Sequence, residues 1–472
     1  MSRFNNPKAL PAMPIRPSGS IAGVDAEPPR SYDSERVRAT VSPPDRVFAI
    51  GSEAKRNTLQ TLCFVVLNIY LLSGCANDLI FHFTGGKAYI SAACVLLLPL
   101  LFLGTGAYLR GLQTPAGKWF AAFAVWLAIA APFSFWKGGT ATLLVNYIPR
   151  MYLVCFYLPA CAVTLAQVRT MVRVVAAGAL VVIMSCYAFG GPTADGRFAI
   201  SGSLFYGNAN ELALQLLLGI IILTYVFFAE SKFAKIVSAA GIVVSLSYVL
   251  KTGSRGALLA TLSTGFVMFL MSRQRLAVVM VAVPALVIAF LLAPTEMRHR
   301  MALIVSDPQA AAARGEDIAA IASQMQREKL LRTSVYLAIT NPVFGVGPGQ
   351  FITKVAGEQE KRGEHADWLG THNSYTQVAS EAGLPALLFY VATIVTCMRM
   401  TYGLYRRSVG RPGLETIAGI SFCMFLSSFA YSIATFFFHE AYGPQLPLIA
   451  GLSIALYLVA KPILERYEEA AV

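Results

Sequence analysis

Residues 371–386 read THNSYTQVASEAGLPA, and the apolar run LLFYVATIVT follows directly at 387–396. A histidine, an asparagine, a serine and a glutamine lie within the first seven residues of this stretch. Gly383 and Pro385 then close its polar part. A polar segment at the outer end of a membrane-length hydrophobic run predicts chemistry at a lipid–water boundary. We therefore expect the rest of the chain to be arranged around this segment.

The composition indicates an integral membrane protein. Of the 472 residues, 56% are hydrophobic and 13% are charged, whereas soluble domains carry about 25% charged residues. The mean hydropathy is +0.59. Apolar runs of about 20 residues, rather than alternating ten-residue segments, predict an all-α fold and not a β-barrel. The net charge of +13 lies mostly in short loops and follows the positive-inside pattern, so we expect no nucleic-acid partner.

We expect about 12 transmembrane helices and one large extracytoplasmic loop. Residues 1–56 are rich in Pro, Ser and Arg and lack an apolar period, which predicts a disordered cytoplasmic tail and not a signal peptide. The other predicted regions are helices 1–9 in 57–293, the large loop in 294–381, helices 10–12 in 382–461 and a cytoplasmic tail in 462–472. The predicted spans are 58–80, 88–109, 118–136, 140–164, 168–190, 209–229, 234–250, 256–272, 276–293, 382–400, 414–436 and 445–461.

The basic residues predict the orientation of the chain. One set of short loops carries sixteen Lys and Arg residues, and the opposite set carries five. Because basic residues favour the cytoplasmic side, both termini are predicted to be cytoplasmic. The loop 294–381 is then extracytoplasmic. The five basic residues on the same side as this loop are Lys87, Lys137, Arg197, Lys251 and Arg255.

The large loop has a predicted structure of its own. Residues 324–340 carry apolar side chains at helical spacing. Asn341-Pro342 is expected to end that helix, and the glycine run 345–349 is expected to form a turn. We expect this run neither to follow a strand nor to open a helix, so a dinucleotide or P-loop interpretation does not apply. The loop is predicted to be a folded cap on the membrane surface.

His372 is the candidate general base. Asn373 or Ser374 is expected to cap a short helix whose face carries His372, Gly383 to end that helix, and Pro385 to begin the next. The pKa of histidine lies near neutrality, which suits proton transfer. The other histidines are interpreted as interfacial polar residues: His82, His299, His365 and His439.

Three arginines are candidate substrate-binding residues. Arg255 lies in a tight turn with two glycines, where a guanidinium can hold a phosphate through two hydrogen bonds. Its alternative interpretation is a snorkelling residue at a helix end. Arg197 precedes residues 208–210, and its alternative role is a salt bridge to Asp195. Arg150 stands inside a predicted span, where an arginine is costly and often functional. The alternative for Arg150 is a structural pair with a carboxylate such as Glu211.

These residues predict a reaction that needs neither a metal nor another cofactor. The arginines are not accompanied by clustered carboxylates or cysteines. All eight cysteines fall inside predicted helices, and none forms a CxxC pair, which argues against disulfides and structural zinc. Arginines beside one histidine suit a dianionic diphosphate and a hydroxyl that must lose its proton. That combination indicates glycosyl transfer from a lipid diphosphate.

The same residues resemble the O-antigen ligase superfamily. The similarity lies in His372-Asn373 followed by Gly383 and Leu387, in Ser254-Arg255-Gly256, in the stretch 341–349, and in Arg197 with 208–210. The resemblance implies a membrane glycosyltransferase of the C class that moves a glycan from undecaprenyl diphosphate to an acceptor hydroxyl, with inversion. It implies that His372 is the base and that Arg197 and Arg255 bind the diphosphate. Asn373 and Arg150 complete the predicted substrate-binding set.

The expected partners are an undecaprenyl-diphosphate-linked glycan, an acceptor glycolipid or glycan such as lipid A-core, and membrane lipid. The expected location is the bacterial inner membrane, with several spans and a periplasmic active site. Close alternatives within the superfamily are a polysaccharide polymerase and a protein O-oligosaccharyltransferase. A twelve-helix transporter is a further alternative. It is disfavoured because the chain shows no internal repeat and its unusual charges lie at the outer face rather than the midplane.

Overall fold

Helices make up most of the described chain. The computed structural model describes residues 58–84, 89–103, 107–193, 196–200, 202–203, 206–272 and 318–470, with the residue pairs 275–276, 279–280, 283–284 and 287–288. The first elements are α3 (Thr58–Cys75), α4 (Asn77–Thr84), α5 (Tyr89–Leu103), η1 (Ala107–Gln113), α6 (Pro115–Ala130), η2 (Ala131–Phe133), α7 (Lys137–Cys161), α8 (Leu165–Phe189), β1 (Gly190–Pro192) and β2 (Phe198–Ile200). The others are α9 (Ala209–Ala229), α10 (Lys232–Lys251), α11 (Arg255–Met271), α15 (Ile318–Thr340), α16 (Phe351–Lys361), α17 (Ser374–Ser408), α18 (Glu415–Ala434) and α19 (Gln445–Glu469).

The predicted all-α membrane fold is confirmed. Among the described residues, nine helices are long and apolar enough to cross a membrane, and α5 and α11 are shorter apolar helices. Large apolar side chains such as Leu96, Val145 and Phe233 are exposed on the bundle, as a lipid-facing surface requires. The predicted tail 1–56 lies outside the described residues, and the predicted span 276–293 lies largely outside them. The total of twelve spans therefore stays a prediction.

The core of the bundle forms around α18, which packs against α9, α17 and α19. Tyr390 of α17 and Tyr431 of α18 are among the largest fully buried side chains. Their hydroxyl oxygens lie 2.8 Å apart and share a hydrogen bond. Because a buried hydroxyl without a partner is costly, this pair fixes the rotation of the two helices relative to each other.

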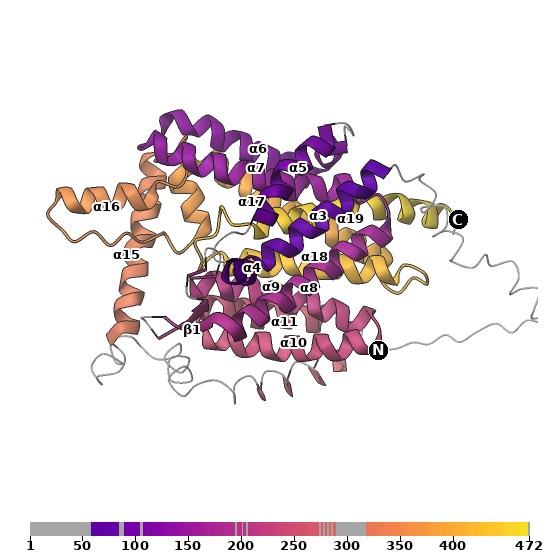
Figure 1. The fold of residues 1–472 in the computed structure, drawn as a ribbon. Coiled ribbons are helices and arrows are strands. Elements are labelled where there is room, and N and C mark those ends of the chain that lie inside the picture. The colour runs from indigo at the N-terminus through magenta and orange to yellow at the C-terminus, as the bar shows by residue number, and fades with distance from the viewer. Residues whose placement is uncertain are drawn as a thin grey trace, which may run out of the picture.

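The bundle has two distinct ends. The helices α15 and α16 lie at one end together with the β1–β2 hairpin, and the C-terminal end of α19 lies at the opposite end (Figure 1). We call the first of these the loop end. The hairpin is antiparallel, with Gly190 opposite Ile200.

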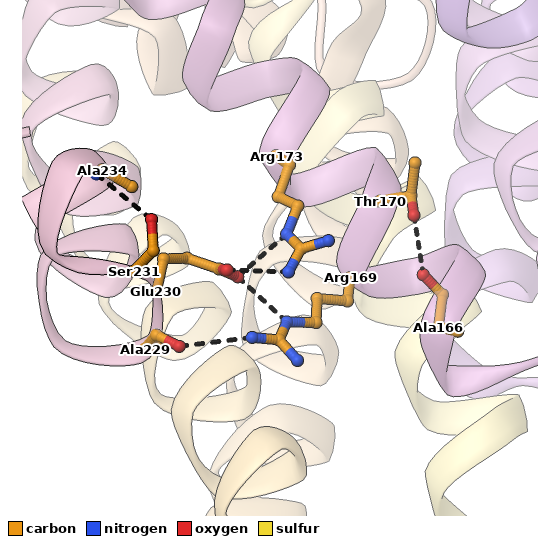
Figure 2. Close-up of polar contacts among 8 residues, drawn as sticks. All are labelled: Ala166, Arg169, Thr170, Arg173, Ala229, Glu230, Ser231 and Ala234. Carbon is orange, nitrogen blue, oxygen red and sulfur yellow. Dashed lines mark hydrogen bonds and ion pairs between the residues drawn. The ribbon is translucent and has the colours of Figure 1, made fainter. Parts of the chain in front are cut away.

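Basic residues at the opposite end form ion pairs. The Glu230 carboxylate, just after α9, accepts a hydrogen bond from Arg169 Nε at 2.9 Å and two from Arg173, at 2.9 and 2.7 Å (Figure 2). The Arg169 guanidinium also donates to the carbonyl of Ala229. Burial raises the pKa of the Glu230 carboxyl, but the two guanidiniums outweigh that effect and hold the pKa below its ordinary range. This cluster ties the start of α8 to the α9–α10 turn.

Two predicted boundaries differ from the structure. The last helix runs to Glu469 rather than ending at 461, because its final residues are good helix formers and Lys461 pairs with Glu465 one turn later. The glycine run 345–349 does open a helix, since α16 begins at Phe351 directly after it. The predicted helix 324–340 is confirmed as the major part of α15.

Candidate functional site

The start of α17 has the predicted capped and glycine-bounded form. The Asn373 side-chain oxygen accepts hydrogen bonds from the backbone N–H groups of Tyr375 and Thr376, at 2.9 and 3.1 Å. Gly383 breaks the helix with φ of +84° and ψ of 174°, and Pro385 follows in the next turn. The Asn373 side-chain oxygen thus serves as the helix cap, and the role of this residue in substrate binding stays a prediction. His372 precedes the cap and does not lie on the helix face.

His372 adopts a left-handed backbone conformation, with φ of +52°. This region is unfavourable for a residue with a Cβ, so the surrounding contacts must hold it. The imidazole is partly buried, and no hydrogen bond joins it to any residue that the structure describes. Burial, together with the positive charges of Arg327 and Arg197, lowers its pKa to about 4. At neutral pH the imidazole is uncharged and can accept a proton.

Arg197 is fixed by three different elements. It follows the tight turn of the β1–β2 hairpin, where the Thr193 hydroxyl donates to its carbonyl oxygen at 2.7 Å. Its Nε donates to the carbonyl of Thr252 at 2.9 Å, and its Nη2 donates to Asn210 Oδ1 at 2.6 Å. Thr252 ends α10 and Asn210 lies in the first turn of α9. Arg197 therefore joins two helix ends at the loop end of the bundle.

Arg255 is the first residue of α11. The Ser254 hydroxyl caps this helix by accepting from the N–H of Ala257 at 3.4 Å, and Gly253 precedes it with φ of +60°. A Cβ on Gly256 would lie 2.3 Å from the Cβ of Phe437, so only glycine lets the start of α11 approach the α18–α19 connection so closely. Arg255 is thereby placed at a helix N-terminus, where backbone N–H groups favour an anion.

Arg327 of α15 is a site residue that sequence reasoning missed. Burial lowers the pKa of its guanidinium, and the positive charge of Arg255 lowers it further. Arg327 also acts on the pKa of His372. Three arginines from separate parts of the chain are thus connected electrostatically. Arg197 and Arg327 both act on the pKa of His372, and Arg255 acts on that of Arg327. Because they repel one another, a polyvalent anion between them would be stabilised.

The glycine run of the large loop is docked onto the short helix that starts α17. The backbone N–H groups of Val346 and Gly347 donate to the carbonyls of Ser380 and Glu381, both at 2.8 Å. The buried Glu381 carboxylate accepts from the N–H groups of Gly349 and Phe351, at 3.0 and 3.1 Å. A Cβ on Gly383 would lie 2.0 Å from the carbonyl oxygen of Val343. These contacts couple α15, which carries Arg327, to the segment that carries His372.

The connection between α18 and α19 forms the other wall beside His372. The Ser374 hydroxyl donates to the carbonyl of Phe438 at 2.8 Å and accepts from the N–H of Glu440 at 2.9 Å. His439 lies between these two residues, and its pKa is lowered by burial and by the neighbouring His372. Burial raises the pKa of the Glu440 carboxyl well above its ordinary value, and the neighbouring Glu211 carboxyl raises it further. The two carboxyls share a hydrogen bond and thus a proton.

Arg150 is not connected to this group. Arg150 is exposed in the middle of α7, and its positive charge interacts with Tyr70 of α3. No contact among the described residues joins it to His372, and Glu211 is bonded to Glu440 instead of Arg150. Of the predicted residues, Arg197 lies close enough to His372 to lower its pKa, and Arg255 acts in the same way on Arg327. Asp195, the alternative partner of Arg197, lies outside the described residues.

Comparison with protein families matches residues 240–391 to a family described as O-antigen ligase. The matched region contains Arg255, Arg327, the glycine run and His372. It ends inside the second half of α17. No curated protein matches the chain.

Proposed function

Residues 240–391 place this chain in the O-antigen ligase superfamily, and from that premise we propose that it transfers a glycan from undecaprenyl diphosphate to an acceptor hydroxyl. The observation that carries the proposal is a neutral His372 close to Arg197 and Arg327, with Arg255 close to Arg327. These groups supply the two functions that the reaction needs. They are charge stabilisation for a leaving diphosphate and a base for the attacking hydroxyl.

The arginines hold the diphosphate of the donor. Each guanidinium offers several donors in a planar fork that fits phosphate oxygens. The N-terminus of α11, capped by Ser254, adds backbone N–H groups and the positive end of a helix dipole beside Arg255. As the glycosidic bond breaks, negative charge grows on the leaving diphosphate, and these groups stabilise it most in the transition state.

His372 removes the proton from the acceptor hydroxyl. The deprotonated oxygen attacks the anomeric carbon from the side opposite the diphosphate, so a single displacement inverts the configuration. In the free protein burial, with a further contribution from the nearby arginines, holds the pKa of His372 at about 4. The negative charges of a bound diphosphate offset the arginines and raise that pKa, which makes the imidazole a stronger base when the donor is present.

We propose that no metal takes part, because guanidiniums provide the positive charge that a metal ion would otherwise supply. The described residues include no group of three His, Cys, Asp or Glu side chains arranged to hold an ion. Transfer by the purified protein is expected to continue in excess EDTA. Loss of turnover in EDTA that Mg²⁺ or Mn²⁺ restores would contradict this proposal.

We also propose that the loop end of the bundle faces the periplasm and that the protein lies in the bacterial inner membrane. Lipid-linked donors are used on that side. Cysteines engineered at position 20 and at the exposed Glu360 test the orientation. We expect an impermeant thiol reagent to label position 360 in intact cells and position 20 only after the cytoplasm is opened. The reverse pattern would place the site on the wrong side for its donor.

The acceptor decides between a ligase and a polymerase. The matched family is described as O-antigen ligase, and for a ligase we propose lipid A-core or a similar glycolipid as acceptor. Removal of the gene should then let full-length lipid-linked polymer accumulate. Accumulation of single lipid-linked repeat units would instead identify a polymerase, and loss of glycans from proteins would identify a protein O-oligosaccharyltransferase.

The central test replaces His372. We expect His372→Ala to lower kcat about 10²–10⁴-fold, as loss of a general base does, while donor binding changes little because the arginines remain. His372→Gln keeps a hydrogen-bonding group but takes no proton, so it should be impaired almost as much. His365→Gln is the matched control, since that histidine is exposed in the loop. Near-normal turnover by His372→Gln would remove His372 from the role of base.

A further inference from the structure

His439 makes two hydrogen bonds that fix which of its nitrogens carries the proton. Its Nδ1 lies 3.0 Å from Thr371 Oγ1, and its Nε2 lies 3.2 Å from Gln377 Nε2. The orientation of the Gln377 amide follows from its other end, because Gln377 Oε1 accepts from the N–H of Ala441 at 3.2 Å. The amide nitrogen, which can only donate, therefore faces His439.

This arrangement assigns a neutral imidazole protonated at Nδ1. The Nε2 of His439 must offer a lone pair to the Gln377 amide, so the proton resides on Nδ1 and is donated to Thr371 Oγ1. A second proton on the ring would set two donors against each other. Burial, together with the neighbouring His372 imidazole, lowers the pKa of His439 to about 4. Both effects keep the ring neutral.

The chain of hydrogen bonds continues from the Thr371 side chain to the backbone of Asn373, the residue after His372. Because Thr371 Oγ1 accepts from His439, its own proton is turned toward the carbonyl of Asn373, 2.9 Å away. The backbone N–H of Asn373 donates to Thr371 Oγ1 at 3.4 Å. One hydroxyl thus closes a ring around His372, which has the left-handed φ of +52°. The imidazole of His439 also packs on Gly370, where a Cβ would lie 2.9 Å from the ring.

We propose that His439 is a positioning residue that acts through the Thr371 hydroxyl to hold the His372 backbone in its left-handed conformation and so aim the catalytic imidazole. This inference rests on the proposed function and adds a residue to it. The groups that surround His439 are consistent with a structural task. The Glu440 carboxyl interacts with that of Glu211, and Arg327 and Arg197 act on the pKa of His372. No step of the transfer requires His439 itself to exchange a proton.

Paired substitutions separate the two nitrogens of His439. His439→Asn keeps a donor near the position of Nδ1, whereas His439→Gln places its amide near the position of Nε2 and loses the bond to Thr371. Thr371→Ser keeps the hydroxyl, and Thr371→Val removes it with little change of shape. We expect His439→Gln and Thr371→Val to lower kcat about 100-fold, since a misplaced catalytic group costs that order of rate. Their KM for the donor should change less than about twofold, because the arginines are untouched.

The conservative variants should recover most of the rate. His439→Asn and Thr371→Ser are expected within about fivefold of the parent kcat, a small fraction of the loss from misplacement. Equal losses in His439→Asn and His439→Gln would overturn the inference, and so would a loss that appears in the KM for the donor. Thermal unfolding of each purified variant in nanodiscs identifies any that fail to fold. The serine and valine variants of Thr371 then provide the same comparison independently of His439.

A spectroscopic measurement tests the assignment without turnover. In protein labelled with ¹⁵N-histidine, the His439 resonances should report a neutral ring protonated at Nδ1 at neutral pH, and they should be assigned through His439→Asn. An imidazolium, or a ring protonated at Nε2, would overturn the inference. If His372→Gln remains fully active, the proposed function fails while the His439 spectrum still decides the hydrogen-bond chain. If His372→Gln is inactive and the two His439 variants behave alike, only the positioning role fails.

Discussion

Arg197 donates a hydrogen bond from Nε to the backbone carbonyl of Thr252, 2.9 Å away. Thr252 lies three residues before Arg255, so the first arginine of the site is fastened to the turn that carries the second. The carbonyl is held in turn, because the Thr252 hydroxyl donates to Val249 at 2.6 Å and accepts from the N–H of Ser254. Two cations are therefore kept in a fixed relation before any anion binds, which lowers the cost of ordering them on binding.

The pH dependence of turnover should differ between the free and the donor-bound enzyme. The rate rises with pH as His372 loses its proton, and kcat/KM reports the free enzyme, whereas kcat reports the complex. With the pKa of free His372 at about 4, kcat/KM should be nearly flat from about pH 5 to 8. The bound diphosphate raises that pKa, so kcat should fall as the pH is lowered through this range. The test is the two profiles measured at several donor concentrations. The proposed electrostatics would be contradicted if kcat fell in acid at the same pH as kcat/KM or at a lower pH.

Arg327→Lys should impair the enzyme although the charge is kept. A lysine presents a point charge and cannot offer two parallel N–H groups to phosphate oxygens. We expect kcat/KM for the donor to fall about 30- to 1,000-fold, equivalent to losing roughly 2–4 kcal/mol of transition-state stabilisation. Arg332→Lys is a matched control on the same helix, since Arg332 is exposed and paired with Glu328. If both variants behave like the parent, Arg327 does not touch the diphosphate.

Gly383→Ala should disrupt the docking of the large loop. The backbone at Gly383 has φ of +84°, and the new Cβ would lie 2.0 Å from the carbonyl oxygen of Val343. Strain of this kind costs about 1–3 kcal/mol before the clash is counted. Gly403→Ala in the same helix has no atom within 4 Å of the new Cβ and should raise stability by up to about 1 kcal/mol. Thermal unfolding in nanodiscs measures both. An unchanged midpoint for Gly383→Ala would mean that the loop is not held where the structure has it.

Glu230→Gln should lower stability without affecting transfer. The substitution removes the charge that pairs with Arg169 and Arg173 at the end of the bundle opposite the site. Because both arginines are partly exposed, we expect a loss of only about 1 kcal/mol or less. The pKa of Glu230 is depressed, so its contribution is present above the ordinary carboxyl pKa and is lost as the pH falls below it. Unfolding midpoints of parent and variant should therefore converge in acid. A variant that loses turnover at full stability would reveal coupling between the two ends.

Local features of the site could be predicted from the sequence, whereas long-range ones could not. Asn373, Gly383 and Pro385 act within a few residues of where they stand, so the capped helix and its break were predicted correctly. The roles of Arg327 and His439 depend on segments far away in the chain. Arg327 lies in an amphipathic helix among other charged residues, and His439 lies between two predicted spans, so neither has a distinctive local pattern. The similarity paired Arg197 with residues 208–210, and the bond to Asn210 gives that pairing a physical basis.

The contacts of Ser374 with Phe438 and Glu440 have a consequence for how the protein is made. The ribosome completes all three arginines and His372 well before it reaches the α18–α19 connection that holds the start of α17. A nascent chain that ends after α17 thus contains every residue proposed for the chemistry but lacks the contacts of Ser374 with the α18–α19 connection. Its site becomes competent only when the last two helices have entered the bilayer and packed. Under the proposed function, partly inserted chains are therefore kept from acting on lipid-linked donor.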